Sequence, residues 1–280
     1  MDKKRSGMSL KAPAPSGVSL HLPGRGSFPA VDDHLVVPEV TRDEIIAGRR
    51  VVAFPAEVPH GDKQVDLDSL LRFHVAPGYV ASADLITRFA VDSDFASDTC
   101  VRREGMDPAT GRRYLEEIAF EVVSTQAERD VTEKARVMHR RGVRRIFGIW
   151  VKGRRKVCEW SAESESWRLL DEGSQIEAPC LGAPLPVKAL LDAALVRRAS
   201  VQALEIQGEP AIQELKATAR ALGRAEGIAE SILKILEVRG IAASSMQREE
   251  ILSCTDVERL DRWLRRAAVA TSADEVTSVG

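Results

Sequence analysis

The stretch that decides the fold runs from Ala96 to Val151 and reads ASDTCVRREGMDPATGRRYLEEIAFEVVSTQAERDVTEKARVMHRRGVRRIFGIWV. Two apolar, β-branched segments flank a turn-rich one, which predicts a pair of strands. An amphipathic segment follows, ends at Gly142 as helices commonly do, and leads into a last apolar segment. Strands that alternate with a helix in this way predict an α/β fold. The predicted elements are strands over 97–103 and 115–123, a helix over 130–141 and a strand over 145–151.

Outward from this centre the same criteria predict further elements. Thr41 and Glu44 have the spacing of a capping box, so a short helix is expected from Thr41 to Gly48. From residue 198 the pattern becomes all-helical, which predicts three regions: a disordered tail over 1–38, an α/β domain over 39–197 and a helical region over 198–280. The other expected elements are strands over 49–54, 85–91, 156–160 and 166–170, and helices over 62–74, 209–222, 225–239, 245–253 and 256–269.

Composition narrows the class of protein. The chain has 280 residues, of which 44% are hydrophobic and 29% charged, and its formal net charge is −2. These values are ordinary for a globular protein and exclude a uniformly basic coat for nucleic acid. We identify no apolar run of membrane-spanning length, no signal-peptide pattern and no metal-ligand spacing among the four cysteines, so a cytoplasmic protein with reduced thiols is expected.

Two carboxylates stand out within the predicted hairpin. If the hairpin loop is Pro108 to Gly111, paired residues have numbers that sum to 219, and Asp98 then stands opposite Glu121. Two carboxylates side by side repel each other unless a cation or a shared proton joins them, and Mg²⁺ suits such a pair. The pairing fails if a bulge intervenes. The ordinary alternative is that Glu121 pairs with a nearby arginine: Arg102, Arg103, Arg112 or Arg113.

Basic residues lie close to the proposed pair in sequence. Lys134 follows Asp130 by four residues, so it either reaches the carboxylate pair or forms an ordinary surface pair with Asp130. From Lys134 to Lys156 the chain carries ten Lys or Arg and no Asp or Glu, which is either a solvated face or a DNA contact surface. The candidate DNA-binding residues are Arg140, Arg141, Arg144, Arg145 and Lys152.

Several segments recur in a characteristic order: His60-Gly61, Ser97-Asp98-Thr99, Phe120 to Ser124, Asp130 with Lys134, Gly142-Val143 with the strand to Val151, and Ala183-Pro184-Leu185. Together they resemble the PD-(D/E)XK nuclease superfamily and, more narrowly, the Uma-type family of bacterial restriction-endonuclease-like proteins. The resemblance implies a restriction-endonuclease-like core, a mixed sheet flanked by helices, that hydrolyses DNA phosphodiester bonds with Mg²⁺ or Mn²⁺. It implies that Asp98 and Glu121 hold the metal and that Lys134, on a helix, supplies the catalytic lysine.

The sequence also departs from that family. Val123 stands where the superfamily commonly has its lysine, Met138 where a tyrosine often follows the helix lysine, and Trp150 where an aspartate is expected. One alternative to a Mg²⁺-dependent endodeoxyribonuclease is therefore a catalytically decayed nuclease fold that acts as a DNA-binding or regulatory protein. The region from Cys254 to Arg266 is similar to the helical tails of recombination-promoting or transposase-like nucleases. A second alternative is a scaffold whose helical tail assembles the chain into homodimers.

Overall fold

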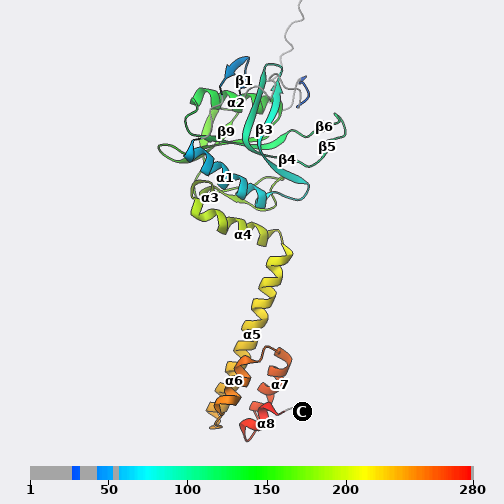
Figure 1. The fold of residues 1–280 in the computed structure, drawn as a ribbon, viewed down its shortest axis with the longest axis vertical. Helices are drawn as coiled ribbons and strands as arrows, with labels where there is room; N and C mark the ends of the chain where they lie inside the picture. The colour runs from blue at the N-terminus through cyan, green and yellow to red at the C-terminus, as the bar shows by residue number, and fades with distance from the viewer. Residues whose placement is uncertain (1–26, 32–42, 53–56, 279–280) are drawn as a thin grey trace, which may run out of the picture. The chain divides into compact units, whose positions relative to one another are not determined.

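The computed structural model describes residues 27–31, 43–52 and 57–278. It divides into two compact units, one up to Gln207 and the other from Gly208. The first unit is a mixed sheet between helices, and the second contains helices alone (Figure 1). The predicted α/β class, with a helical C-terminal region, is therefore confirmed. Within the described residues, no helix is long and apolar enough to span a membrane.

The sheet of the first unit has eight strands in the order β10-β9-β8-β7-β4-β1-β2, and β3 also pairs with β4. Only β7 and β8 are parallel among the pairs of this sheet that the structure describes; the others are antiparallel. The strands are β1 (Glu44–Ile46), β2 (Arg49–Val51), β3 (Tyr79–Ala90), β4 (Ser93–Arg103), β7 (Glu116–Val123), β8 (Arg145–Trp150), β9 (Lys156–Ser161) and β10 (Ser166–Leu169). Two small hairpins stand apart: β5 (Met106–Asp107) with β6 (Arg112–Arg113), and β11 (Gln175–Ile176) with β12 (Leu185–Pro186).

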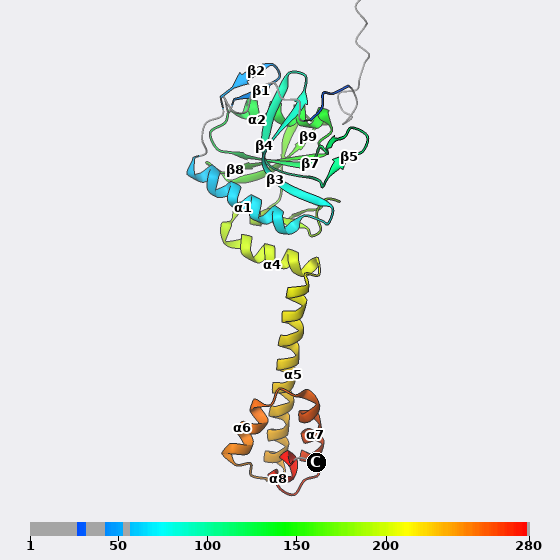
Figure 2. The ribbon, with the colours of Figure 1, turned by 45° about the vertical axis from the view of Figure 1, so that its right-hand side comes forward.

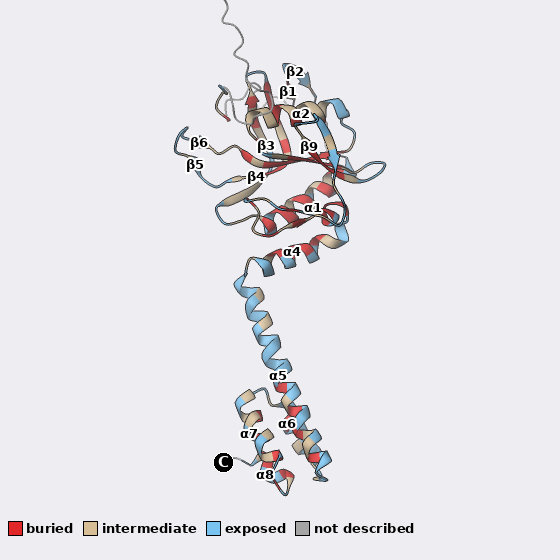
Figure 3. Cartoon of the chain, turned by 180° about the vertical axis from the view of Figure 1, so that it is seen from behind, coloured by how far each residue is buried: buried red, intermediate tan, exposed pale blue. Residues whose placement is uncertain are grey.

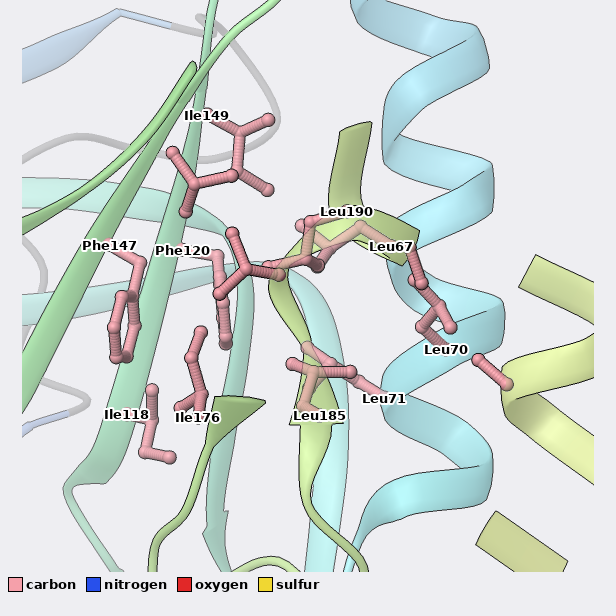
Figure 4. Packing of buried hydrophobic residues seen from close by; sticks show 14 of the residues in the cluster. Leu67, Leu70, Leu71, Ile118, Phe120, Phe147, Ile149, Ile176, Leu185 and Leu190 are labelled. Carbon is pink, nitrogen blue, oxygen red and sulfur yellow. The ribbon is translucent and has the colours of Figure 1, made fainter. Parts of the chain in front are cut away.

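Helices cover both faces of the sheet. Figures 1 and 2 show α1 (Val58–His74) on one face and α2 (Glu128–Arg141) on the other. Figure 4 shows how Phe120 and Phe147 of the sheet face Leu67, Leu70 and Leu71 of α1. On the α2 side, Ala119 and Ile146 pack with Ala135 and Met138. Since successive strand residues alternate between faces, β7 directs Ile118, Phe120 and Val122 toward α1 and leaves Glu121 on the α2 side.

The boundary of the first unit lies later than predicted. The segment after β12 forms α3 (Val187–Leu191), a 3₁₀ turn (Ala193–Leu195) and α4 (Val196–Ile206). Val196 and Ala199 of α4 are buried in the same apolar cluster as Leu67 of α1, so α4 belongs to the α/β unit and not to the helical region expected from residue 198.

The second unit contains α5 (Pro210–Val238), α6 (Ser245–Ser253), α7 (Val257–Ala267) and α8 (Ala273–Thr277). We expected two helices over 209–239, but the structure has one, because Gly223 and Gly227 each cost a helix only about 1 kcal/mol and no proline follows Pro210 within it. The second half of α5 packs against Leu260 and Trp263 of α7. Figure 3 shows its first half exposed. Ser244 caps α6 and forms a capping box with Gln247, and Asp256 caps α7.

Two expectations near the N-terminus are changed. Residues 27–31, predicted to be part of the tail, are packed: the Arg88 N–H donates to the Val31 carbonyl at 2.8 Å, and Val31 is buried. The rest of that tail lies outside the described residues, as do Thr41 and Arg42 of the predicted capping box. The helix expected up to Gly48 is wrong, because Glu44–Ile46 is a strand that pairs with Arg49–Val51.

The turn of this first hairpin offers a stability test. Its two central residues, Ala47 and Gly48, both have positive φ, 48° and 74°, as a type I′ turn requires. Alanine is strained there, whereas asparagine tolerates that conformation. We expect Ala47→Asn to raise the free energy of unfolding by about 0.5 to 1 kcal/mol and Gly48→Ala to lower it by a similar amount, measured by urea denaturation. Opposite shifts would contradict this turn assignment.

Candidate active site

A gap in the sheet positions the site. Strand β3 pairs with β4 along nearly all of its length and so occupies one edge of β4. Strands β1 and β7 must therefore share the other edge: β1 pairs at Asp94, and β7 pairs from Thr99 onward. Between these two points no described strand pairs with this edge of β4.

Side chains replace the missing strand in this gap. The Ala96 N–H donates to Glu44 Oε1 at 3.1 Å, and Lys134 Nζ donates to the Ala96 carbonyl at 3.1 Å. Lys134 Nζ also lies 2.8 Å from Glu44 Oε1, which ties the two side chains together. Buried backbone groups require such partners, so Glu44 and Lys134 maintain the sheet at the point where its ladder is interrupted.

Asp98 lies where β4 and β7 part. The Val122 N–H donates to Asp98 Oδ2 at 2.5 Å, and Gln64 Nε2 of α1 donates to the Asp98 carbonyl at 3.1 Å. His60 Nε2 lies 3.5 Å from Asp98 Oδ1. A hydrogen bond to Asp98 raises the pKa of His60 above its ordinary value, against the opposing effect of burial. The carboxylate of Asp98 is thus held between α1 and the end of β7.

The predicted register is confirmed over the pairs that lead to the site. Thr99 pairs with Phe120, Cys100 with Ala119 and Val101 with Ile118, and each pair of numbers sums to 219. A bulge does occur, because Arg102 pairs with Glu116, but the sum returns to 219 at the β5–β6 hairpin, where Met106 pairs with Arg113. Asp98 and Glu121 each lie one residue beyond the Thr99–Phe120 pair.

Glu121 is a buried carboxylate with incomplete partners. Its side chain is 5% exposed, and its Oε2 lies 3.4 Å from Lys134 Nζ. Its Oε1 is buried and has no hydrogen-bond partner among the residues that the structure describes. Burial raises the pKa of Glu121 to about 8; Lys134 opposes this shift, while Asp98 and Glu44 add to it. Glu121 Oε1 therefore keeps an unused capacity to accept a proton or to bind a cation.

Lys134 is the cation of the site. Burial lowers its pKa, but the negative charges of Glu121, Glu44 and Asp98 together raise that pKa above the ordinary value. Both ordinary alternatives from the sequence are wrong. Asp130 pairs with Arg49 at 2.5 Å, and the Glu121 ion pair that the structure describes is with Lys134 rather than with an arginine.

Some residues of the site were not predicted from the sequence. Glu44 was expected in a helix cap, and Gln64 carries no signal beyond its place in an amphipathic helix. His60 was part of the family resemblance but had no assigned contact. Their roles depend on long-range pairing: Glu44 reaches Ala96 only because β1 joins β4, and His60 reaches Asp98 only because α1 crosses the sheet there.

The proposed DNA-binding residues do not gather at this site. In the parallel pair β7–β8, Glu121 is aligned with Gly148 but Arg145 with Ile118, so the arginines that join α2 to β8 lie toward the opposite end of these strands. They also have local partners. Arg140 lies near Glu133, Arg141 donates to the Pro29 carbonyl, Arg144 pairs with Glu117, and Arg145 pairs with Glu159. Lys152 pairs with Glu57 and is the member of this group that follows β8 at the site's end of the sheet.

The donor atoms fit a hard divalent cation with few protein ligands. No group of three His, Cys, Asp or Glu side chains with metal-binding geometry occurs among the described residues. Mg²⁺, however, is commonly held by one or two carboxylates, with water and substrate oxygens completing its shell. Asp98 and Glu121, with the partnerless Oε1, provide that minimal set.

A likeness to a known protein is found among solved structures. No family model matches the chain, and no curated protein matches it. Among solved structures, the chain is similar to a candidate nuclease of the DUF820 family from Anabaena variabilis, with 16% sequence identity and a TM-score of 0.44. The match covers 53% of this chain and 88% of the other.

Proposed function

We propose that the protein is a metal-dependent nuclease that hydrolyses DNA phosphodiester bonds. The observation that carries this proposal is the buried Oε1 of Glu121, which has no hydrogen-bond partner in the described part of the chain, while Lys134 contacts the other oxygen of the same carboxylate. The resemblance of the sequence to PD-(D/E)XK nucleases supplies the choice of DNA. Asp98 and Glu121 would hold Mg²⁺ or Mn²⁺.

Each residue then has a defined task. A divalent cation bound by the two carboxylates would supply an acidified water and neutralise charge on the phosphate. Lys134 directs its ammonium toward Glu121 and would orient the attacking water or a phosphate oxygen. Val123, on the strand, is buried and apolar. Under this proposal the lysine from α2 would take the place of a lysine on the strand. His60 and the Val122 N–H hold Asp98 in position.

One observation favours the binding-only alternative. An ammonium group has three donors, and Lys134 has three acceptors within the chain: Glu44, the Ala96 carbonyl and Glu121. A lysine occupied in this way stabilises the sheet without contacting a substrate. A decayed nuclease fold that binds DNA without cleaving it is therefore the second candidate function.

Cleavage assays separate the two functions. The wild type, Asp98→Asn and Glu121→Gln are incubated with plasmid and single-stranded DNA in Mg²⁺, Mn²⁺ or EDTA. We expect metal-dependent cleavage by the wild type and a loss of more than about a hundredfold in each variant, because each loses a charged metal ligand. Glu163→Gln, an exposed glutamate in the β9–β10 turn, is the matched control and should cleave normally.

The outcomes are distinct. Cleavage that persists in both variants contradicts the proposed site. A wild type that binds DNA but cleaves it with none of these metals supports the decayed fold instead.

A further inference from the structure

A second feature of the chain lies at the end of the sheet that carries Asp98 and Glu121. There β8, β9 and β10 run beside the first turn of α2 and border a groove of ≈ 450 Å³. Three cationic side chains line it against one acidic one, Glu128. The lining residues that matter are Trp150, Lys152, Arg154, Lys156, Trp167 and Leu169.

The aromatic rings of the groove are held in place. The Trp150 and Trp167 rings meet edge to face, with centroids 5.3 Å apart and an interplanar angle of 82°. Trp167 Nε1 donates to Thr132 Oγ1 of α2 at 3.1 Å. Lys156 Nζ lies 4.6 Å from the centroid of the Trp150 ring. Lys156 thus lies over one face of the Trp150 ring, and the groove combines fixed aromatic rings with cations.

The groove begins at β8, the strand next to β7, which carries Glu121. Gly148 is aligned with Glu121 across the β7–β8 pair. A Cβ atom added to Gly148 would lie 2.5 Å from the Trp150 ring, so that ring covers β8 at the level of Glu121. An extended ligand that bound in the groove would therefore lead toward the candidate active site.

We propose that this groove binds a single-stranded stretch of nucleic acid and presents it to the neighbouring carboxylate site. Its link to cleavage rests on the proposed function, whereas the binding itself does not. Single strands are bound by aromatic rings, on which bases stack, together with cations that follow the phosphates, and the groove supplies both. The bases of a duplex are stacked on one another and cannot offer their faces to Trp150. Lys152 is paired with Glu57 at an exposed position, where such a pair contributes little and a phosphate can replace the carboxylate.

Binding is measured by fluorescence anisotropy with the full chain in EDTA, where metal-dependent cleavage is absent. The probes are an oligothymidylate, an abasic oligonucleotide and a duplex of equal length. We expect the wild type to bind oligothymidylate most tightly. Trp150→Ala should weaken that binding about tenfold and change abasic binding less than twofold, because only base stacking is lost.

Further variants show whether a loss of binding comes from the groove or from unfolding of the protein. Trp150→Phe keeps an aromatic face and should bind within about threefold of the wild type. Leu169, 54% exposed, can be changed to glutamate with little effect on the fold, and the added negative charge should weaken binding of both single strands. Lys152→Gln with Arg154→Gln should weaken binding, while Arg197→Gln with Arg198→Gln, two exposed arginines of α4, should not.

The results separate this inference from the proposed function. Loss of single-strand binding in the groove variants supports the groove even if the wild type cleaves nothing. Cleavage that requires Glu121, together with unchanged binding in Trp150→Ala and Leu169→Glu, overturns the groove and leaves the nuclease standing. Equal weakening of duplex and single strand in Trp150→Ala also overturns it.

Discussion

Replacement of Lys134 by methionine is expected to lower the free energy of unfolding at pH 8 by about 3 to 5 kcal/mol. Lys134 is largely buried and is the donor shared by Glu44, Glu121 and the Ala96 carbonyl. Removing it leaves two carboxylates close together and one backbone carbonyl without its partner. Urea denaturation followed by circular dichroism measures the change.

The pH dependence and a second variant show whether the loss of stability comes from the ion pairs of Lys134. At pH 5 Glu121 can take a proton, so the loss caused by Lys134→Met should be smaller there than at pH 8. Adding Glu121→Gln to Lys134→Met should recover part of the stability at pH 8. Lys188→Met, at an exposed position of α3, is the matched control and should stay within about 0.5 kcal/mol of the wild type. Similar losses from both lysines would contradict the buried ion-pair network.

The second large effect concerns Glu121 itself. Its pKa is about 8 in the folded chain, against an ordinary value of 4.5. Between these pH values the folded state keeps a proton that the unfolded state has lost, so stability falls as the pH rises through that window and levels off above about 8. Glu121→Gln removes this penalty. In EDTA at pH 9 we expect the variant to be more stable than the wild type by a few kcal/mol.

A pH series of unfolding experiments tests the argument. The two proteins should have similar stability near pH 4.5 and should diverge steadily toward pH 8. Parallel curves across this range would show that Glu121 is ionised at little cost, in conflict with its burial. The same substitution should abolish cleavage under the proposed function. A variant that is more stable but inactive would indicate that Glu121 is kept for its function at a cost in stability.

Local patterns predicted the centre of the fold well. Alternation and turn chemistry identified β4, β7, α2 and β8, and the register sum of 219 holds at the pairs that lead to Asp98 and Glu121. It holds because the irregularity at Arg102 and Glu116 is compensated before the β5–β6 hairpin. Sequence arithmetic cannot foresee such a compensation, since bulges depend on packing.

The failures have a common cause. Thr41 to Gly48 has the local signature of a helix start, but Glu44–Ile46 pairs with Arg49–Val51, and Ile45 also pairs with Asp94, so these three residues form a strand. The site contacts of Glu44, Gln64 and His60 also connect elements that are far apart in sequence. The charge run illustrates the same point: four of the five arginines and lysines singled out from it pair with carboxylates that the sequence alone does not place beside them.

The interrupted ladder beside β4 has a consequence for how this protein can change over generations. Glu44 and Lys134 keep Ala96 bonded, so a mutation at either should be removed by selection because the chain would fold poorly, whether or not any chemistry matters to the cell. Glu121 differs, because neutralising it should make the protein more stable. If descendants of this chain drift without selection for activity, Glu121 should be lost early and Lys134 late.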